Sequence, residues 1–173
     1  MIVIGIDPGL ATVGFGVIRT EKNNITPVSY GAIRTSAEKQ APQRLLEIYT
    51  GVSELFVKYV PSAVAVEKLF FNKNVTNAMS VSEARGVIVL AAEQNHIPVF
   101  EYTPNEVKQA ITGSGRADKK QMQVMIKRLL NLSEIPRPDD AADGLSIALC
   151  HINIMTTRVN GSISTRIKST TLS

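Results

Sequence analysis

The sequence predicts an α/β domain in which helices flank a mixed five-stranded sheet, with the first three strands antiparallel. Three strand-like segments open the chain, and helical and strand-like segments alternate after them. The chain has 173 residues, of which 44% are hydrophobic, and this is enough for one domain with a substantial core. We expect that domain to span residues 1–157 and a disordered basic tail to span residues 158–173.

The first three strands are expected at residues 1–7, 13–20 and 25–34. The first of them is almost continuously apolar, which is typical of a strand buried on both faces, and the turn signal Pro8-Gly9 ends it. In the second strand, Gly14 and Gly16 allow another part of the backbone to approach closely. Three strands in direct succession favour an antiparallel meander.

Helices and two more strands follow in alternation. Apolar residues recur at helical spacing between Pro42 and Val60, and Pro61 breaks that pattern. The two remaining strands are expected at residues 63–68 and 97–102. Further helices are expected at residues 78–94, 104–111, 118–131 and from Asp140 onward. Residues 69–77 follow neither period, so we expect an exposed loop there.

Charge and cysteine content favour a polyanionic partner and a reducing compartment. There are 19 Lys and Arg residues against 15 Asp and Glu residues, and several of those acids gather in one small cluster. The single cysteine, Cys150, cannot form an internal disulfide, which fits cytoplasmic residence. The chain enters its first strand without a leader-like segment, and no apolar stretch approaches the roughly 18 residues of a membrane span, so we expect no membrane association.

Four acidic residues lie where three different elements end or begin. Asp7 ends the first strand, Glu67 ends the fourth, and Asp140 and Asp143 lie one turn apart on one face of the last helix. Taken alone, Asp7 would be a turn residue, and Asp139, Asp140 and Asp143 would be helix-capping groups. In the metal-site interpretation, Asp139 is the expected N-cap. A charged residue at the end of an apolar strand, such as Glu67, seldom lacks a partner. One packing of the helix over the strand ends would bring all four together.

A cluster of four carboxylates predicts a metal site. Carboxylates in a partly desolvated cleft repel one another by several kcal/mol, so such a cluster is tolerable mainly with cations between its members. Ligand sets made only of oxygen favour Mg²⁺, for which Mn²⁺ can substitute, over zinc.

The loop at residues 69–77 carries aromatic, cationic and amide side chains together. The residues in question are Phe70, Phe71, Lys73 and Asn74. Phenylalanine is usually buried in a core, and this remains the alternative here. Next to a metal ligand, however, aromatics beside cations are suited to stacking on bases or wedging between them. We therefore predict a DNA contact for this loop, led by Phe70.

The segment from 108 to 128 is strongly basic. A run of charge is usually just a solvated face of a helix. Two glycines in this segment permit close backbone approach, and cations beside a carboxylate cleft suit a phosphodiester backbone. The candidates for phosphate contacts are Lys108, Arg116 and Lys119.

The helix at 78–94 has apolar residues almost all round. Most such helices only pack on their own sheet, but this distribution makes a second, intermolecular face plausible.

Together these motifs resemble the bacterial RuvC family of Holliday-junction resolvases, in family order from residue 1 to about residue 155. The element order also suits the ribonuclease H-like architecture of that family. The motifs that carry the resemblance are Asp7-Pro8-Gly9, Glu67-Lys68-Leu69-Phe70, Ala84-Arg85-Gly86, Val107-Lys108-Gln109 and Asp140-Ala141-Ala142-Asp143.

The resemblance implies a homodimer that makes paired incisions in four-way DNA junctions during homologous recombination and DNA repair. It also implies partnership with the RuvA and RuvB branch-migration proteins. The family's junction-probing aromatic falls on Phe70, its DNA-contacting lysines fall on Lys108 and Lys119, and the helix at 78–94 would supply the dimer contact. Its four catalytic metal ligands fall on Asp7, Glu67, Asp140 and Asp143.

The implied chemistry is phosphodiester hydrolysis with two Mg²⁺ ions per active site, which leaves 5′-phosphate ends. Two other classes remain open at this point. An RNA-processing nuclease would use the same acids but contact 2′-hydroxyls, and a non-catalytic binder of branched DNA would need neither metal nor Asp7. A sugar-kinase or actin-like ATPase would need a second domain, for which 173 residues leave no room.

Overall fold

A five-stranded mixed sheet forms the centre of the protein. The computed structural model describes the backbone of residues 1–22, 24–68 and 75–169, and the side chains of residues 1–22, 24–68 and 78–157. The sheet has the order β3-β2-β1-β4-β5, in which β1, β2 and β3 are antiparallel and β4 and β5 run parallel to β1. The predicted fold class is thus confirmed. The strands are β1 (Ile2–Asp7), β2 (Thr12–Glu21), β3 (Asn24–Arg34), β4 (Ala63–Glu67) and β5 (Val99–Tyr102).

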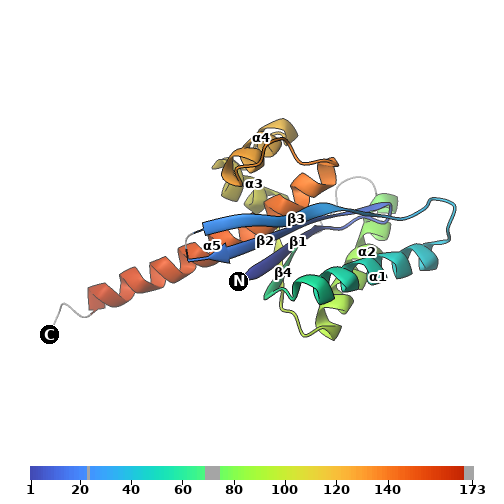
Figure 1. Ribbon diagram of the computed structural model, residues 1–173, viewed down its shortest axis with the longest axis horizontal. Coiled ribbons are helices and arrows are strands. Elements are labelled where there is room, and N and C mark those ends of the chain that lie inside the picture. Colours follow the sequence, from blue (N-terminus) through green and yellow to red (C-terminus); the bar gives the residue numbers. More distant parts are fainter. Residues whose placement is uncertain (23, 69–74, 170–173) are drawn as a thin grey trace.

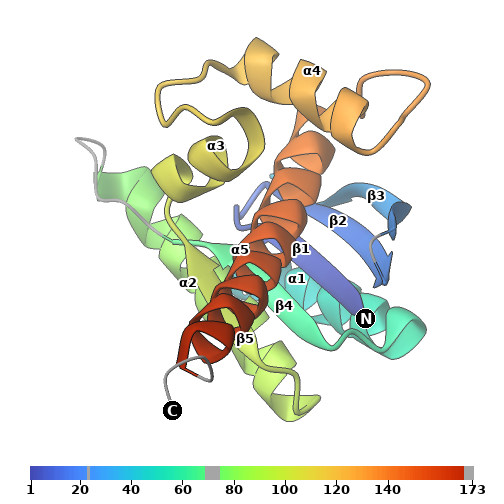
Figure 2. The same cartoon turned by 90° about the vertical axis from the view of Figure 1, so that its left-hand side faces the viewer.

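Helices cover both faces of the sheet (Figure 1). The helices are α1 (Ala41–Tyr59), α2 (Val75–Gln94), α3 (Pro104–Thr112), α4 (Lys119–Leu129) and α5 (Asp139–Ser169). One buried cluster lies between the sheet and α1 and α2, and the other lies between the sheet and α3, α4 and α5. Figure 2 shows α5 crossing the sheet obliquely, with α3 and α4 beside its first half.

Alternation along the strands decides which side chains face α5. Val3 on β1 and Ala65 on β4 belong to the cluster on the α5 side. Successive side chains of a strand point to opposite faces, so Asp7, four residues after Val3, shares that face. The same rule places Glu67 on the face of Ala65. Both strand-ending acids therefore face the helix that carries the other two.

Glycines let α5 lie directly on the sheet. A Cβ atom at Gly14 would be 2.1 Å from the backbone oxygen of Asp140, and one at Gly16 would be 2.4 Å from the backbone nitrogen of Leu145. At Gly5 the nearest atom also belongs to the α5 backbone, at 2.2 Å. We call Gly5, Gly14 and Gly16 the glycine track. The close approach predicted for Gly14 and Gly16 is confirmed, and the approaching element is α5.

The observed elements differ from the expected ones mainly at helix ends. Helix α2 begins at Val75, three positions before the expected start. Helix α5 continues to Ser169, inside the segment expected to be a disordered tail. Apolar residues at Val159, Ile163 and Ile167 keep a four-residue spacing that favours continued helix. The division of the chain at residue 157 stays a prediction.

Within the described ranges, no helix is both long enough and apolar enough to cross a bilayer.

Candidate active site

Two parallel strands bring the first two acids to one edge of the sheet. Ile6 on β1 lies opposite Val66 on β4, and the next residue along each strand is Asp7 or Glu67. Neighbouring parallel strands end at the same edge, so their last residues are adjacent. Because both side chains point toward α5, the two carboxylates occupy the same side of that edge.

The glycine track brings the other two acids over the same edge. Asp7 pairs with Gly14 on β2, and the backbone oxygen of Asp140 lies over Gly14. Asp140 is therefore one strand away from Asp7. Asp143 follows one turn later on the same face of α5. The first turns of α5 thus cover the ends of β1 and β4, as the sequence predicts.

The four acids are electrostatically coupled to one another. Burial, followed by the carboxylates of Glu67, Asp143 and Asp140, raises the pKa of Asp7 to about 8, and nearby Lys119 opposes this effect. Burial and then Asp143 raise the pKa of Glu67. Burial also raises the pKa of Asp143, where Lys119 opposes the shift and Asp140 adds to it. Each negative charge therefore makes the next one more costly.

The donor set fits a hard divalent cation. All four side chains offer only carboxylate oxygens, which are the ligands that Mg²⁺ and Mn²⁺ prefer. The raised pKa values of Asp7, Glu67 and Asp143 indicate that added positive charge would stabilise their ionised forms. Over the stretches that the structure describes, no three acidic, histidine or cysteine side chains converge on one point as ion ligands do. The acids are therefore coupled through their charges and are not gathered around a single point.

We predict that the protein loses stability with rising pH when divalent cations are removed. Asp7 has a folded-state pKa of about 8 against an ordinary 3.8, so the folded state holds this proton more tightly than the unfolded state does. The free energy of unfolding should then be highest near pH 4 and fall by about 2–4 kcal/mol by pH 8. Denaturant titrations in chelator from pH 4 to pH 8 measure it. A profile that is flat or rises over that interval would contradict the coupling.

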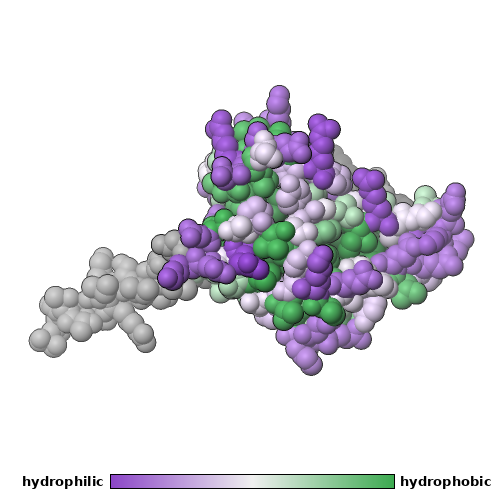
Figure 3. All heavy atoms as spheres, in the orientation of Figure 1, coloured by the Kyte–Doolittle hydropathy of each residue, from purple (hydrophilic) through white to green (hydrophobic). Residues whose placement is uncertain are grey.

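Helices α3 and α4 each place one lysine side chain beside this cluster. Lys108 and Lys119 line a cavity of about 200 Å³ together with Glu67 and Asp143. Hydrophilic side chains project from the α3–α4 part of the surface in Figure 3. The structure therefore places both predicted lysines beside the acids. Sequence reasoning missed the other residues that line the cavity, which are Pro104, Val107, Met122, Ser146 and Ile147.

Capping boxes fix where these two helices begin. At α3, the Thr103 side chain accepts a hydrogen bond from the backbone N–H of Glu106, and the Glu106 carboxylate accepts one in return from the Thr103 N–H. Asp118 and Gln121 make the same reciprocal pair at α4. Such boxes set a helix start to a single residue. Lys119 consequently stands at the first position of α4, at the rim of the cavity.

Asp139 pairs with α4 and is not the N-cap that the sequence suggests. Helix α5 begins at Asp139 itself. The Asp139 carboxylate lies 3.2 Å from the Lys119 ammonium and accepts a hydrogen bond of 3.0 Å from Gln123. The hydrogen bond and the charge of Lys119 lower the pKa of Asp139. The Asp139 side chain therefore pairs with Lys119 and Gln123 on α4 and does not cap its own helix.

Arg116 is the one remaining DNA-contact candidate among the described residues, and it does not line this cavity. Arg116 lines a separate, open hollow on α3 and the following loop, together with Asn105 and Gln109. Four candidates from the loop after β4 lie outside the described residues, namely Phe70, Phe71, Lys73 and Asn74.

Comparisons with known proteins point to one family. The family model described as "Crossover junction endodeoxyribonuclease RuvC" matches residues 3–151. A crossover junction endodeoxyribonuclease RuvC of Alkaliphilus metalliredigens is 56% identical over 151 residues, which are 87% of this chain and 92% of the relative. The one of Rubrobacter xylanophilus is 57% identical over 150 residues, 87% of this chain and 84% of the relative.

Solved structures agree with this result. A structure of T. thermophilus RuvC in complex with a Holliday junction substrate superposes with a TM-score of 0.85 and 36% identity. The match covers 90% of this chain and 94% of the other. The yeast mitochondrial Holliday junction resolvase Ydc2 matches with a TM-score of 0.62 at 13% identity over 87% of this chain and 78% of the other, which shows a shared fold alone.

Proposed function

The chain belongs to the RuvC family of crossover junction endodeoxyribonucleases, and we propose from this premise that it resolves four-way (Holliday) DNA junctions by paired symmetric nicks. Homologous recombination and DNA repair are the processes that produce such junctions. The observation that carries the proposal is the site itself. Four carboxylates from β1, β4 and α5 form one coupled cluster, and lysines from α3 and α4 line the cavity beside it.

The acid cluster is suited to hold the divalent metal that a nuclease of this family implies. We propose two Mg²⁺ ions per site, held by Asp7, Glu67, Asp140 and Asp143. When bound, the ions would supply the charge that activates a water molecule and stabilises the departing 3′ oxygen, which leaves a 5′ phosphate. The raised pKa values of Asp7, Glu67 and Asp143 support this role, because a nearby cation would stabilise the ionised form of each.

The protein's own residues would bind the DNA and hold the acids in position. Lys108 and Lys119 would contact DNA phosphates at the cavity and hold the scissile strand against the acids. Asp7 and Glu67 are fixed by the sheet, and Asp140 and Asp143 by the packing of α5, so little reorganisation is needed when the strand arrives. We propose DNA contacts for Phe70, Phe71, Lys73, Asn74 and Arg116 as well, on the grounds of residue type alone.

The direct test is cleavage of labelled synthetic substrates by the purified protein. A four-way junction, a linear duplex and an RNA–DNA hybrid should be incubated with and without Mg²⁺. Paired symmetric nicks confined to the junction and dependent on metal are expected. Cleavage of the hybrid alone would indicate an RNA-processing nuclease, and junction binding without any cleavage would indicate a structural binder.

We further propose that α2 forms the contact of a homodimer. Met79 and Leu90 are 61% and 54% exposed, and nothing lies within 4 Å of a Cβ built at Gly86. The spacings of seven and four residues place these three on one side of the helix, opposite the buried Ala84 and Ile88. A two-fold axis through such a face would present two active sites to a junction that is itself nearly two-fold symmetric.

Leu90→Glu should convert the dimer to a monomer, because two copies of the new charge would face each other across the axis. Analytical ultracentrifugation measures the change. Leu129→Glu, on α4, is the matched control because Leu129 is also about half exposed, at 47%. A wild-type protein that sediments as a monomer, or a Leu90→Glu variant that stays dimeric, would refute this interface.

Partnership with RuvA and RuvB stays a proposal that rests on family membership, and co-purification of the three proteins on a junction would test it. Cytoplasmic residence, expected from the single cysteine, likewise stays a prediction.

A further inference from the structure

Lys119 is held by a carboxylate that does not belong to the predicted catalytic set. Its ammonium lies 3.2 Å from Asp139 and 3.8 Å from Asp143. Only the shorter of these distances is within hydrogen-bond range. The lysine is thus anchored at the rim of the cavity by Asp139 and faces the acid cluster without being bonded to it.

Asp139 is itself fixed in place by α4. One carboxylate oxygen of Asp139 meets Lys119, and the other accepts the hydrogen bond from the Gln123 amide. Lys119 and Gln123 are four residues apart, so they lie on the same face of α4. The first residue of α5 therefore ties two side chains of α4 together next to Asp140.

This arrangement leaves Lys119 free to bind a second anion. An ammonium group has three N–H donors, and Asp139 occupies one of them. The long side chain of lysine otherwise samples many rotamers, and a fixed carboxylate restricts it to those that reach the cavity. The side chain of Lys119 is 56% exposed, so an incoming phosphate can reach its remaining donors.

We propose that Asp139, supported by Gln123, is a positioning residue that holds the Lys119 ammonium where it contacts a DNA phosphate beside the reacting group. The proposal rests on the junction-cleaving function above. In this proposal Asp139 promotes the contact with DNA, whereas its negative charge alone would oppose it. A bare acid at the rim would repel DNA, so its removal would only strengthen binding.

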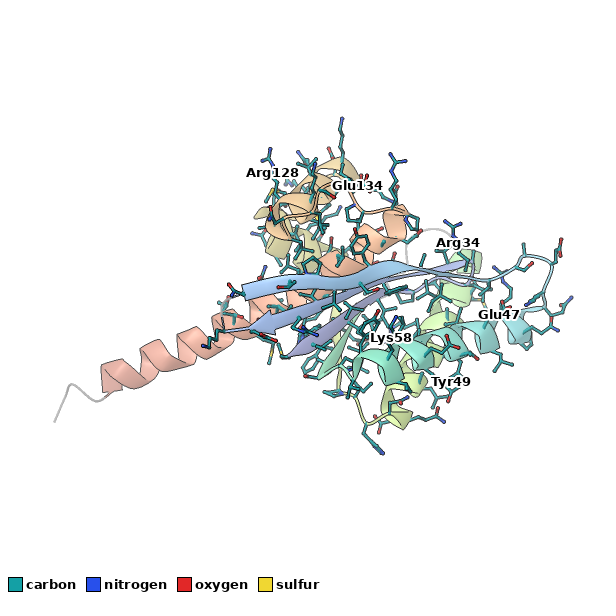
Figure 4. The ribbon with its side chains drawn as sticks, viewed as in Figure 1. Arg34, Glu47, Tyr49, Lys58, Arg128 and Glu134 are labelled. Carbon is teal, nitrogen blue, oxygen red and sulfur yellow. The ribbon has the colours of Figure 1, made fainter. Side chains whose placement is uncertain are left out.

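The test is a double-mutant cycle between Asp139→Asn and Lys119→Ala. Single-turnover cleavage of a four-way junction is measured at saturating protein with Mg²⁺. Asp139→Asn should slow cleavage about two- to fivefold, and it should have no further effect when Lys119 is already alanine. Gln123→Ala should act in the same direction but more weakly. The matched control is Glu134→Gln, which removes one exposed acidic charge from the region after α4 that Figure 4 shows.

Cleavage at the wild-type rate in Asp139→Asn, or an equal loss with and without Lys119, would overturn the positioning role. Thermal melting of each variant checks for a folding defect. Gln123→Ala weakens the positioning of Asp139 without a change of charge, so it tests the same role independently.

A binding cycle in chelator separates this proposal from the proposed function, because it needs no cleavage. Asp139→Asn should tighten junction binding less in the wild-type background than in the Lys119→Ala background, since it also releases the lysine. Greater tightening in the wild-type background would mean that Asp139 competes with DNA for Lys119, and this would refute the proposal. A wild-type protein that binds the junction but never nicks it would refute only the proposed function.

Discussion

Asp7→Asn should abolish cleavage of four-way junctions. Asp7 lies at the end of β1, next to the end of β4. The carboxylates of Glu67, Asp143 and Asp140 all raise its pKa. An amide in its place removes a negative charge from the centre of the cluster while keeping nearly the same shape. We expect a fall in cleavage rate of about a thousandfold or more, at or above the usual loss of one preorganised charged group. Junction binding in chelator should persist, because Lys108 and Lys119, which we propose to contact phosphate, are unchanged.

The same substitution should stabilise the protein when metal is absent. Burial and three neighbouring carboxylates make the ionised form of Asp7 costly, and an amide escapes that cost. At pH 8 in chelator, the free energy of unfolding of Asp7→Asn should exceed that of the wild type by about 2–4 kcal/mol. The pH dependence described above should also become shallower. Opposite signs for activity and stability are typical of a residue kept for function.

Denaturant titration and single-turnover cleavage measure the two halves of this prediction. Glu21→Gln is the matched control, because Glu21 is an exposed acid at the opposite end of the sheet, at the end of β2. Cleavage by Asp7→Asn at the wild-type rate would exclude Asp7 from the catalytic set. A loss of stability would mean that the acids do not repel one another in the folded protein.

Gly14→Ala should damage both the fold and the site. The new Cβ would lie 2.1 Å from the backbone oxygen of Asp140, a contact that no rotamer change can relieve. The start of α5 must therefore move away from β2 by about 1 Å or more. Overpacking of this kind costs about 1–3 kcal/mol. Because a displacement of about 1 Å in a catalytic group can cost roughly a hundredfold in rate, cleavage should fall by a similar factor.

Thermal denaturation and cleavage at a temperature well below the transition separate the two effects. Gly115→Ala is the control for stability, because the nearest atom to a Cβ at Gly115 is 3.8 Å away, which is an ordinary contact. If Gly14→Ala were as stable and as active as the wild type, α5 would not be held on the sheet by the glycine track.

Strand and helix patterns predicted most of the fold because each carries a period. The apolar run of β1, the helical spacing of α1 and the succession of three strands led to the observed sheet, with its first three strands antiparallel. Helix ends were less predictable. The start of α2 and the continuation of α5 past residue 157 differ from the expected bounds, because helix ends carry less sequence signal than helix interiors.

The acid cluster could be predicted because strand ends and helix turns have defined geometry. Asp7 and Glu67 end neighbouring strands, and Asp140 and Asp143 share a helix face, so one packing unites them. The position of Asp139 could not be read in this way. Its partner Lys119 lies on another helix, and only the packing of α4 against α5 brings them together.

One buried polar contact also escaped the sequence. The hydroxyl of Tyr102 and Nδ1 of His151 are linked by a hydrogen bond of 2.8 Å, and the His151 ring lies 4.6 Å from that of Phe100. Tyr102 is the strand partner of Glu67, so this contact lies directly next to an acid of the site. The sequence spacing of residues 102 and 151 does not predict this hydrogen bond.

The acids and the lysines reside on different tiers of the protein. Every predicted metal ligand belongs to the sheet or to the helix pressed on it, whereas Lys108 and Lys119 stand on α3 and α4, which lie outside that inner tier. A substitution on α3 or α4 can therefore change the lysines without moving the four carboxylates, which are positioned by the sheet and by the glycines beneath α5.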